Sequence, residues 1–231
     1  VSEKNGGSGL SRLEATLVFE ALSMACPSVA AFLSIHNMCV SMIDKFGSEE
    51  LIERVMPDAL RMKNVISYCL TEPGSGSDAA ALKTQAKKTN AFYKLTGTKS
   101  FISGGGYSDS YLVMCRTGEP GEKNISTLYV EDGTEGLSYG ALEQKMGWRA
   151  QPTRQVHMDN CEVQLGNLVG KEGHGFNYAM AGLDGGRLNI SACSLGAAQQ
   201  ALNKSLNYMN ERYAFGKRIN QFQALQFKVA D

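Results

Sequence analysis

The hydrophobic pattern of the chain changes its period twice, and this change limits the folds that the chain can adopt. Residues 10–63 carry apolar side chains at steps of three and four, which is typical of amphipathic helices. From Val65 onward apolar residues alternate with polar ones, and β-branched and aromatic residues become frequent. Helical spacing resumes near Asn177 and continues to Arg212. The order helices, strands, helices predicts an α+β fold rather than a series of βαβ units.

Turn and capping residues divide the helical regions. The first helix begins near residue 10, and Pro27 suits the start of the second, which Gly47 ends. Ser48, followed by two glutamates, predicts a third helix that runs towards Arg61. Near the end of the sequence, a last helix is expected from Gln221 onward.

Six strands are predicted in the middle region. They span 65–71, 81–87, 92–103, 109–116, 125–131 and 153–161. Turn residues separate them at 73–74, 89–90, 104–106, 119–121 and 132–133. Because no helical stretch lies between consecutive strands, we expect a central antiparallel β-barrel-like domain. We expect part of a helical domain at 1–64, the β-domain at 65–170 and the start of a helical bundle at 171–231.

Composition argues against several classes of protein. Lys plus Arg and Asp plus Glu are both 23, so the zero net charge gives no reason to expect a nucleic acid or a membrane surface as partner. No apolar run approaches the ~20 residues of a membrane helix. The six cysteines form no C-x-x-C pair and the three histidines are scattered, so we expect buried free thiols and no metal site. The first residues lack the features of a signal peptide and open inside a glycine-rich turn.

Two strand-associated segments could contact a ligand. Residues 68–78 (YCLTEPGSGSD) lead from a strand into a loop whose glycines allow close approach and whose hydroxyls can hydrogen-bond a phosphate or a ring edge. Its glycine spacing matches neither a P-loop nor a Rossmann turn, and a surface turn remains an alternative. Residues 99–105 (KSFISGG) could form a wall against a planar ligand, or be an ordinary strand that ends in a glycine turn.

Two helix-associated segments also allow both a structural and a ligand-binding interpretation. In 183–187 (LDGGR) the two glycines cost ~1 kcal/mol each against alanine, so close helix packing or close approach of a ligand must offset them. Arg187 could meet an anion. Residues 211–219 (ERYAFGKRI) are rich in arginine and aromatic residues, which suits an interface, a phosphate contact or a solvated helix end. No catalytic triad, zinc-protease or kinase signature is present, and the histidines are interpreted as core or surface residues.

Taken together and in order, these segments resemble the acyl-CoA dehydrogenase family over essentially the whole chain. YCLTEPGSGSD, KSFISGG, LDGGR and ERYAFGKRI with the following FQ are similar to the family's signature segments. IHNMCVSMIDKFG and GWRAQPTRQV are most similar to its branched-chain members. The resemblance implies FAD as cofactor and the oxidation of an acyl-CoA to the 2,3-enoyl-CoA. A base removes the α-proton while a hydride leaves Cβ for the flavin.

The resemblance also assigns roles to residues. Expected to line the flavin are Tyr68, Cys69, Leu70, Thr71, Glu72, Pro73, Gly74, Ser75, Gly76, Ser77, Phe101, Ile102 and Ser103. Expected to bind the acyl-CoA are Ser77, Asp184, Gly185, Gly186 and Arg187. Expected to meet the flavin of a neighbouring subunit are Arg212, Phe215, Phe222 and Gln223.

The catalytic base is not expected within this chain. In most of the family a glutamate of the C-terminal helical domain is the base, and that region would follow Asp231. In isovaleryl-type members the base directly precedes the arginine that matches Arg187, and here that position is Gly186. We therefore expect a fragment that lacks both ends of the family sequence, that is inactive alone and that binds FAD weakly.

The resemblance leaves the substrate open. A short branched acyl-CoA similar to isobutyryl-CoA is favoured, which would link the protein to valine catabolism and fatty acid metabolism. A straight short-chain or 2-methylbutyryl substrate, or an inactive fragment that binds flavin or acyl-CoA, are the alternatives. The full-length protein is expected to be a homotetramer (a dimer of dimers) of the mitochondrial matrix, with electron-transfer flavoprotein as electron acceptor.

Overall fold

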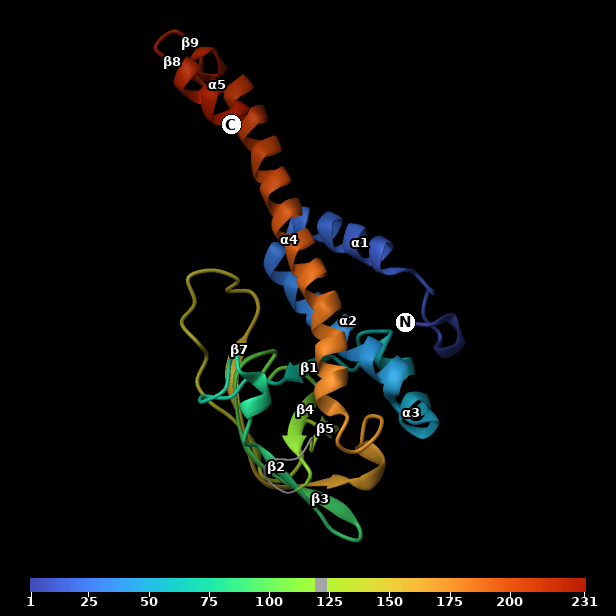
Figure 1. Cartoon of the computed structure of the whole chain (residues 1–231). Coiled ribbons are helices and arrows are strands. Elements are labelled where there is room, and N and C mark those ends of the chain that lie inside the picture. The colour runs from blue at the N-terminus through green and yellow to red at the C-terminus, as the bar shows by residue number, and fades with distance from the viewer. Residues whose placement is uncertain (119–123) are drawn as a thin grey trace.

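Helices flank a strand-rich middle in the computed structural model, which describes residues 1–118 and 124–231 (Figure 1). The first helices are α1 (Arg12–Ala25), α2 (Pro27–Phe46) and α3 (Glu49–Ala59). The strands of the large sheet are β1 (Ile66–Cys69), β2 (Gln85–Lys88), β3 (Phe92–Ser103), β4 (Ser110–Arg116), β5 (Ile125–Glu131), β6 (Leu137–Tyr139) and β7 (Thr153–Gln164). Then come α4 (Gly175–Glu211), the short strands β8 (Tyr213–Ala214) and β9 (Lys217–Arg218), and α5 (Gln223–Ala230). The α+β class is confirmed, and the turn expected at 119–121 lies outside the described residues.

Capping residues begin the first helices, and those at Pro27 and Ser48 were predicted. At α1 the Ser11 hydroxyl accepts the Leu13 N–H at 3.2 Å, and the Glu14 carboxylate accepts the Ser11 N–H at 2.7 Å, which completes a capping box. Pro27 occupies the first position of α2, where its missing N–H leaves no bond unmade. The Ser48 hydroxyl caps α3 through the Leu51 N–H at 3.2 Å.

The sheet is mixed, so the expectation of purely antiparallel strands was wrong for two pairs. Strand β1 runs parallel to β4, with Ile66 opposite Ser110, and β2 touches β4 in parallel at one position. The other pairs are antiparallel, and the longest joins β3 to β7. Residues 70–109, which contain the β2–β3 hairpin, form a crossover that returns the chain beside β1 in the same direction. A period-two pattern marks a strand but carries no information about its direction.

At three places the structure corrects or adds to the local predictions. Residues 79–81 form a 3₁₀ turn, and the strand predicted at 81–87 begins only at Gln85. Strand β6 was not predicted, because three residues are too few to show alternation. The break predicted after Arg212 is a tight hairpin of β8 and β9.

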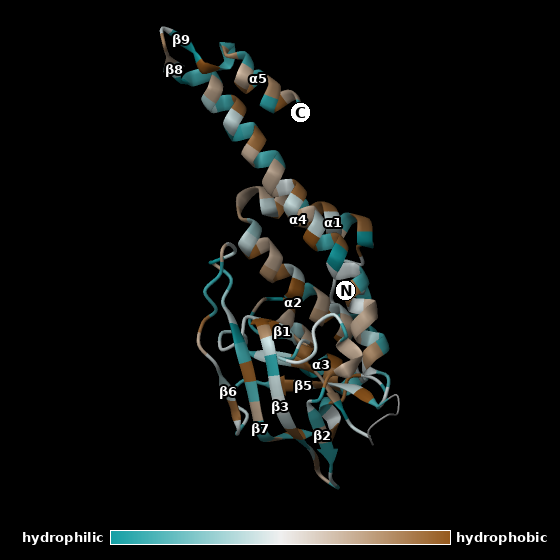
Figure 2. Cartoon of the chain, turned by 60° about the vertical axis from the view of Figure 1, so that its left-hand side comes forward, coloured by the Kyte–Doolittle hydropathy of each residue, from teal (hydrophilic) through white to brown (hydrophobic). Residues whose placement is uncertain are grey.

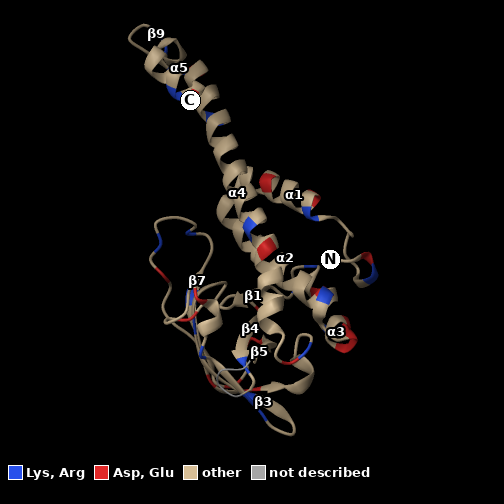
Figure 3. Cartoon of the chain, viewed as in Figure 1, with Lys and Arg blue, Asp and Glu red and all other residues tan. Residues whose placement is uncertain are grey.

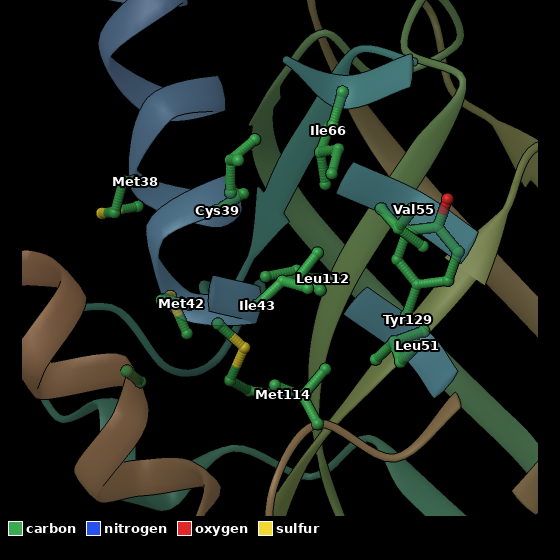
Figure 4. Packing of buried hydrophobic residues seen from close by; sticks show 14 of the residues in the cluster. Met38, Cys39, Met42, Ile43, Leu51, Val55, Ile66, Leu112, Met114 and Tyr129 are labelled. Carbon is green, nitrogen blue, oxygen red and sulfur yellow. The ribbon is translucent and has the colours of Figure 1, made fainter. Parts of the chain in front are cut away.

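Strand β4 is buried on both faces and separates two cores. Leu112 and Met114 point towards α2 and α3, where they join a cluster that includes Ile43 and Leu51 (Figure 4). The alternate residues of β4, among them Val113, pack inside the curled sheet with side chains of β3 and β7. Each fully buried large aliphatic side chain contributes ~1.5–3 kcal/mol, so these two layers hold the sheet against the helices.

Helix α4 runs from the sheet past α1 and α2 and then extends beyond them (Figures 1 and 2). Its buried residues end at Gly196, and none of residues 197–211 is buried. In the cartoon of Figure 3, the positions of acidic and basic residues are interspersed along the chain, in keeping with their equal numbers. No helix in the described ranges combines the length and the apolar character needed to cross a bilayer.

The expectation of buried free thiols is confirmed for five of the six cysteines. All six cysteines are free, and only Cys26 among them is partly accessible. Within residues 1–118 and 124–231, no group of metal-ligating side chains is assembled. His36 is buried, with Nε2 at 3.0 Å from the Ala59 carbonyl and Nδ1 accepting the Ile66 N–H at 3.0 Å. This ring therefore joins α2, the end of α3 and β1.

Candidate functional site

A cavity of about 730 Å³ lies where the sheet meets α2 and α4. Ten of its lining residues were predicted as site residues: Tyr68, Leu70, Thr71, Gly76, Ser77, Phe101, Ile102, Ser103, Gly186 and Arg187. Three of the four segments singled out in the sequence therefore meet at one place. The cavity is large enough for part of a cofactor together with a small ligand.

Strand alternation decides which residues of β1 face the cavity. Tyr68 and Leu70 point towards the helices, whereas Cys69 between them is buried inside the curled sheet. Burial raises the pKa of Tyr68, and the neighbouring Cys39 and Cys69 thiols act in the same direction, so its hydroxyl stays neutral. Cys69 was expected to line the ligand, but its side chain points to the opposite face of the sheet, because successive side chains of a strand alternate between the two faces.

Glu72 does not line the cavity but anchors the loop beneath it. Its carboxylate lies 2.8 Å from the Lys99 ammonium and accepts the backbone N–H groups of Lys83 at 2.6 Å and Thr84 at 2.9 Å. Burial raises the pKa of Glu72, but the hydrogen bond and charge of Lys99 and the two N–H groups outweigh it, so the pKa lies below its ordinary value. Burial lowers the pKa of Lys99, and Glu72 opposes that change.

Lys99 is fully buried and also donates to the Leu70 carbonyl at 3.0 Å. Its ammonium therefore ties the end of β1 and the loop to β3. Removing either partner would leave an unpaired charge in the interior, which is strongly destabilising.

The loop that follows Glu72 is tight and leaves its glycines open. The backbone groups of Glu72 and Ser75 bond each other in both directions, and the Ser75 hydroxyl donates to the Asp78 carbonyl at 2.6 Å. A Cβ atom added at Gly76 would meet nothing within 4 Å. Thr71, Gly76 and Ser77 line the cavity, whereas the predicted residues Pro73, Gly74 and Ser75 do not.

Strand β3 carries a bulge where it reaches the cavity. The register with β7 shifts between Lys99 and Ile102, and Phe101 has a φ of 58°, a left-handed conformation that costs ~1–2 kcal/mol outside glycine. The Phe101 side chain is 67% exposed and lines the cavity, while Ile102, which also lines it, is buried and packs in the core inside the sheet. The bulge therefore turns an aromatic ring to the cavity that a regular strand would direct elsewhere.

Two buried polar atoms on the cavity wall have no hydrogen-bond partner among the described residues: Ser100 Oγ and Gln151 Oε1. The amide nitrogen of Gln151 donates to Ser103 Oγ, which fixes this side chain beside β3. Buried polar groups are nearly always paired, so an unpaired hydroxyl and carbonyl on a cavity indicate a ligand with its own donors and acceptors. The heteroatom-rich edge of a flavin fits this requirement.

The two glycines of the segment 183–187 have different roles, one in close helix packing and the other at the cavity. Gly185 packs against Arg12 of α1, whose guanidinium would lie 1.6 Å from an added Cβ, so this glycine serves close helix packing. Gly186 and Arg187 line the cavity. Asp184 does not, and it lies 3.6 Å from Arg187 on the exposed surface.

The segment 211–219 is not part of this cavity. Arg212, Phe215, Phe222 and Gln223 lie at the far end of α4, with the β8–β9 hairpin (Figure 1). Phe215 is 94% exposed at the hairpin tip, and its ring centroid is 6.2 Å from that of Phe222. The Lys217 ammonium lies 4.4 Å from the centre of the Phe222 ring. Phe215, Phe222 and Lys217 therefore form a separate aromatic and cationic cluster, and Arg212 and Gln223 lie at the same end of the molecule.

Sequence reasoning missed Ser100 of β3, the consecutive residues Asp78, Ala79 and Ala80, and cavity residues from three further places. The loop after β6 contributes Trp148 and Gln151, while the two helices contribute mostly apolar side chains: Ser34, Ile35, Met38, Phe176, Met180, Leu183 and Ile190. Trp148 was detectable as the single tryptophan of the chain. The helical residues carry no such signal, because a cavity-facing methionine or leucine has the same spacing as a core residue.

Few titratable groups reach the cavity. Among the lining residues within the described part of the chain, Asp78 is the one carboxylate, and it is exposed. The others that titrate are Tyr68 and Arg187, and no histidine is present among them. The apolar part of the cavity, next to α2 and α4, thus lacks a group suited to accept a proton.

Comparison with known proteins gives a consistent result along the chain. The model of the acyl-CoA dehydrogenase N-terminal domain matches residues 1–63, that of the middle domain 67–161 and that of the C-terminal domain 173–231. The chain is similar to "Isobutyryl-CoA dehydrogenase, mitochondrial" of Dictyostelium discoideum, with 53% identity over 100% of the chain and 56% of that protein. It therefore spans little more than half the length of this relative.

Solved structures share the fold. The structure of butyryl-CoA dehydrogenase from Megasphaera elsdenii is 37% identical with a TM-score of 0.93, covering 100% of this chain and 62% of that one. The FAD complex of PigA is 27% identical with a TM-score of 0.90, covering 100% of this chain and 61% of that one.

Proposed function

Because the chain belongs to the acyl-CoA dehydrogenase family, we propose that it supplies the flavin-facing cavity of an enzyme that oxidises a short branched acyl-CoA, similar to isobutyryl-CoA, to the 2,3-enoyl-CoA. The 53% identity with a relative of that name supports a branched substrate. Straight short-chain and 2-methylbutyryl substrates are the alternatives, and the full-length protein decides among them.

The observation that carries the proposal is the division of the cavity into two chemically different ends. One end has the unpaired Ser100 Oγ and Gln151 Oε1 and the exposed ring of Phe101. The other end, between α2 and α4, has apolar walls such as Met180 and Leu183. A site that oxidises an acyl chain needs this pairing, with a polar place for the cofactor ring beside an apolar place for the chain.

At the polar end, Thr71, Ser100, Ser103 and Gln151 would hydrogen-bond the edge of the FAD ring, and Phe101 and Trp148 would cover it. When bound, the flavin supplies the acceptor for a hydride from the substrate Cβ. The Glu72–Lys99 ion pair lies under the loop and keeps Thr71 in place. Cys69, Glu72, Pro73, Gly74 and Ser75 would then act by shaping the loop rather than by lining the ring.

At the other end, the chain's residues would align the substrate. Gly186 has no side chain, so an acyl chain can lie against the α4 backbone, and Ser77 and Arg187 would contact the polar CoA portion. The apolar walls exclude water, which strengthens each polar contact that aligns Cα and Cβ. Asp184 and Gly185 would support this part of α4 from outside the cavity.

We propose that the catalytic base is not among residues 1–231. The Gly186 position cannot accept a proton, and Asp78 lies on an exposed loop rather than at the apolar end. Asp78→Asn in the full-length protein is therefore expected to keep turnover. Loss of turnover with FAD still bound would place the base in this chain and contradict the proposal.

The far end of α4 fits a different role. Arg212, Phe215, Phe222 and Gln223 are proposed to contact the flavin of a neighbouring subunit, because an aromatic and cationic cluster this exposed suits contact with a phosphate-bearing cofactor. We also propose that the full-length protein is a homotetramer, that electron-transfer flavoprotein is its electron acceptor, and that it is located in the mitochondrial matrix. The last rests on the relative, which is named as mitochondrial.

The substrate is tested by dye-coupled dehydrogenation with the full-length protein. Isobutyryl-, butyryl-, 2-methylbutyryl- and isovaleryl-CoA are compared at equal concentration, and kcat/KM is expected to be highest for isobutyryl-CoA. A methylene in such a pocket changes kcat/KM ~10–200-fold, so the comparison is decisive. A clear preference for butyryl-CoA would overturn the branched substrate.

A second candidate function is binding of flavin or acyl-CoA without turnover, which the lack of a base at the apolar end favours for residues 1–231 alone. Titration of this chain with FAD, followed by visible absorbance, is expected to show weak binding. Tight, stoichiometric FAD on a monomeric chain would contradict the need for a neighbouring subunit.

A further inference from the structure

Arg116, the last residue of β4, bonds the loop that forms one wall of the cavity, although its own side chain does not line the cavity. From this geometry we propose that Arg116 is a positioning residue for the acyl-CoA, which it affects through the loop residues that face the ligand. The inference rests on the proposed acyl-CoA substrate. We call residues 72–84, which lie between β1 and β2, the cavity loop.

The cavity loop has few side chains that could hold it in place. Its residues that line the cavity are Gly76, Ser77, Asp78, Ala79 and Ala80. All of these residues are small except Asp78, and all are exposed except Ala79, which is half-buried. Because burial of apolar area is the main force that fixes a segment, this stretch depends on hydrogen bonds to its backbone instead.

The Arg116 guanidinium supplies such bonds. Nε donates to the Leu82 carbonyl at 2.7 Å, Nη2 to the Ala80 carbonyl at 2.6 Å and Nη1 to Asn124 Oδ1 at 2.7 Å. The backbone N–H of Arg116 also donates to the Thr84 carbonyl at 2.8 Å. Each of the three guanidinium nitrogens thus has an acceptor within the protein, which suits a role in holding the loop rather than in binding a phosphate directly.

The cavity loop is therefore fixed at two places. At its ends, the Glu72 carboxylate accepts the N–H groups of Lys83 and Thr84. In its middle, residues 79–81 form a 3₁₀ turn, and the last carbonyls of a helical turn have no partner inside it. Arg116 provides partners at this turn, whose first two residues line the cavity. Without Arg116, the ligand would have to order the turn itself, which costs conformational entropy on binding.

The place of the turn indicates which step Arg116 affects. Ser77, two residues before the turn, is proposed above to contact the polar CoA portion, whereas Ser103 and Gln151 of other segments are proposed to bond the FAD ring. Loss of Arg116 should therefore weaken acyl-CoA binding and leave FAD binding and the chemical step largely unchanged.

The proposal is tested with full-length holoenzyme and isobutyryl-CoA. For Arg116→Met, KM is expected to rise about tenfold or more and kcat to change less than about twofold. Arg116→Lys should recover only part of the loss, because one ammonium cannot reproduce the planar fork of donors. Arg54→Met is the matched control, since Arg54 bonds Asn167 and pairs with Glu131 away from the cavity. Its KM is expected to equal that of the wild type.

Two further measurements separate positioning from a general loss of stability. Isobutyryl-N-acetylcysteamine keeps the thioester but lacks the rest of CoA, so its KM should be equal in wild type and Arg116→Met. In a double-mutant cycle on KM for isobutyryl-CoA, Arg116→Met and Ser77→Ala should together cost less than the sum of their separate effects. An unchanged KM for isobutyryl-CoA in active Arg116→Met, an equal rise with the truncated thioester, or fully additive effects would each overturn the proposal.

If Arg116→Met does not fold, Arg116→Gln keeps one donor and is expected to show the same pattern with a smaller rise in KM. Failure of the proposed function gives a different outcome. If the wild-type protein oxidises none of the acyl-CoAs, the enzymatic proposal fails, and calorimetric titration with isobutyryl-CoA then measures the role of Arg116. Weaker binding by Arg116→Met than by Arg54→Met supports the positioning role. Equal binding by the two variants, or no binding by the wild type, refutes it.

Discussion

The two halves of α4 meet different surroundings although they belong to one continuous helix. In the near half, residues 175–196, small residues such as Gly185 and Gly196 are buried against α1, and the cavity opens beside Gly186. In the far half, residues 197–211, no residue is buried, and Leu202 and Leu206 are 39% and 37% exposed. Figure 2 shows hydrophobic bands on this far half, which stands clear of the sheet.

The difference shows which features this chain can explain by itself. The near half of α4 and the cavity beside it are stabilised by residues of this chain. These residues form the close packing on α1, the ion pair under the cavity loop and the walls of the cavity. The far half has leucines at helical spacing that remain more than a third exposed in the described chain. Changes in the near region should therefore alter stability, and changes in the far half should alter it little.

The largest expected effect is at the buried ion pair beneath the cavity loop. Glu72→Leu leaves the Lys99 ammonium, whose side chain is 0% exposed, without its counter-charge, which should lower the free energy of unfolding by ~3–5 kcal/mol. The double variant Glu72→Leu with Lys99→Met should recover much of this loss. Urea denaturation of the three proteins measures it. Equal stability of wild type and Glu72→Leu would show that the Glu72–Lys99 ion pair does not stabilise the fold around the cavity loop.

A smaller effect is expected where α4 packs on α1. A Cβ at Gly196 would lie 2.0 Å from the Glu20 carbonyl oxygen, which belongs to backbone and cannot turn away. Gly196→Ala should therefore lower the free energy of unfolding by ~1–3 kcal/mol, despite the better helix propensity of alanine.

Gly186→Ala is the matched control for this change. Its Cβ meets only the flexible Met38 Sδ, at 3.3 Å, so no loss of stability is expected. If both variants lost the same stability in urea, close packing would not distinguish these two glycines.

A pH effect is expected from His36, which joins α2 to β1. Burial lowers the pKa of His36 below its ordinary 6.5, and the Ala59 carbonyl and Asp109 oppose this only in part. Between the lowered pKa and 6.5 the unfolded chain binds more protons than the folded one. The free energy of unfolding therefore falls as pH decreases through this window, by at most ~1.4 kcal/mol per pH unit, and then levels off.

The matched variant for the pH effect is His36→Gln, whose amide has donor and acceptor atoms but does not titrate. Urea midpoints are measured from pH 7.5 down to pH 5. The decrease of the midpoint with falling pH should be smaller in the variant, because the contribution of His36 is absent. An identical slope in both proteins would assign the pH dependence to other groups.

The sequence predicted which elements form and which segments line the cavity. It predicted less well the direction of the strands and the contacts of individual side chains. The helix starts at Pro27 and Ser48 and the strand at β4 depend on neighbouring residues, and such local patterns were interpreted correctly. The parallel pairing of β1 with β4 depends on where residues 70–109 fold, which no local pattern encodes. Glu72 shows the same limit, because its role depends on Lys99, which lies far from it in the sequence.

The smallest expected effect is in the far half of α4. Leu202→Ser and Leu206→Ser remove exposed apolar groups, so each should change the free energy of unfolding of residues 1–231 by no more than ~0.5 kcal/mol apart from the lower helix propensity of serine. Leu202→Ala and Leu206→Ala separate these two contributions, because alanine removes the side chain without a loss of propensity. A loss of several kcal/mol in the alanine variants, measured in urea at low protein concentration, would mean that the far half is covered within this chain. A loss that appears only as protein concentration rises would instead show that another copy covers it, because stability gained by association depends on concentration.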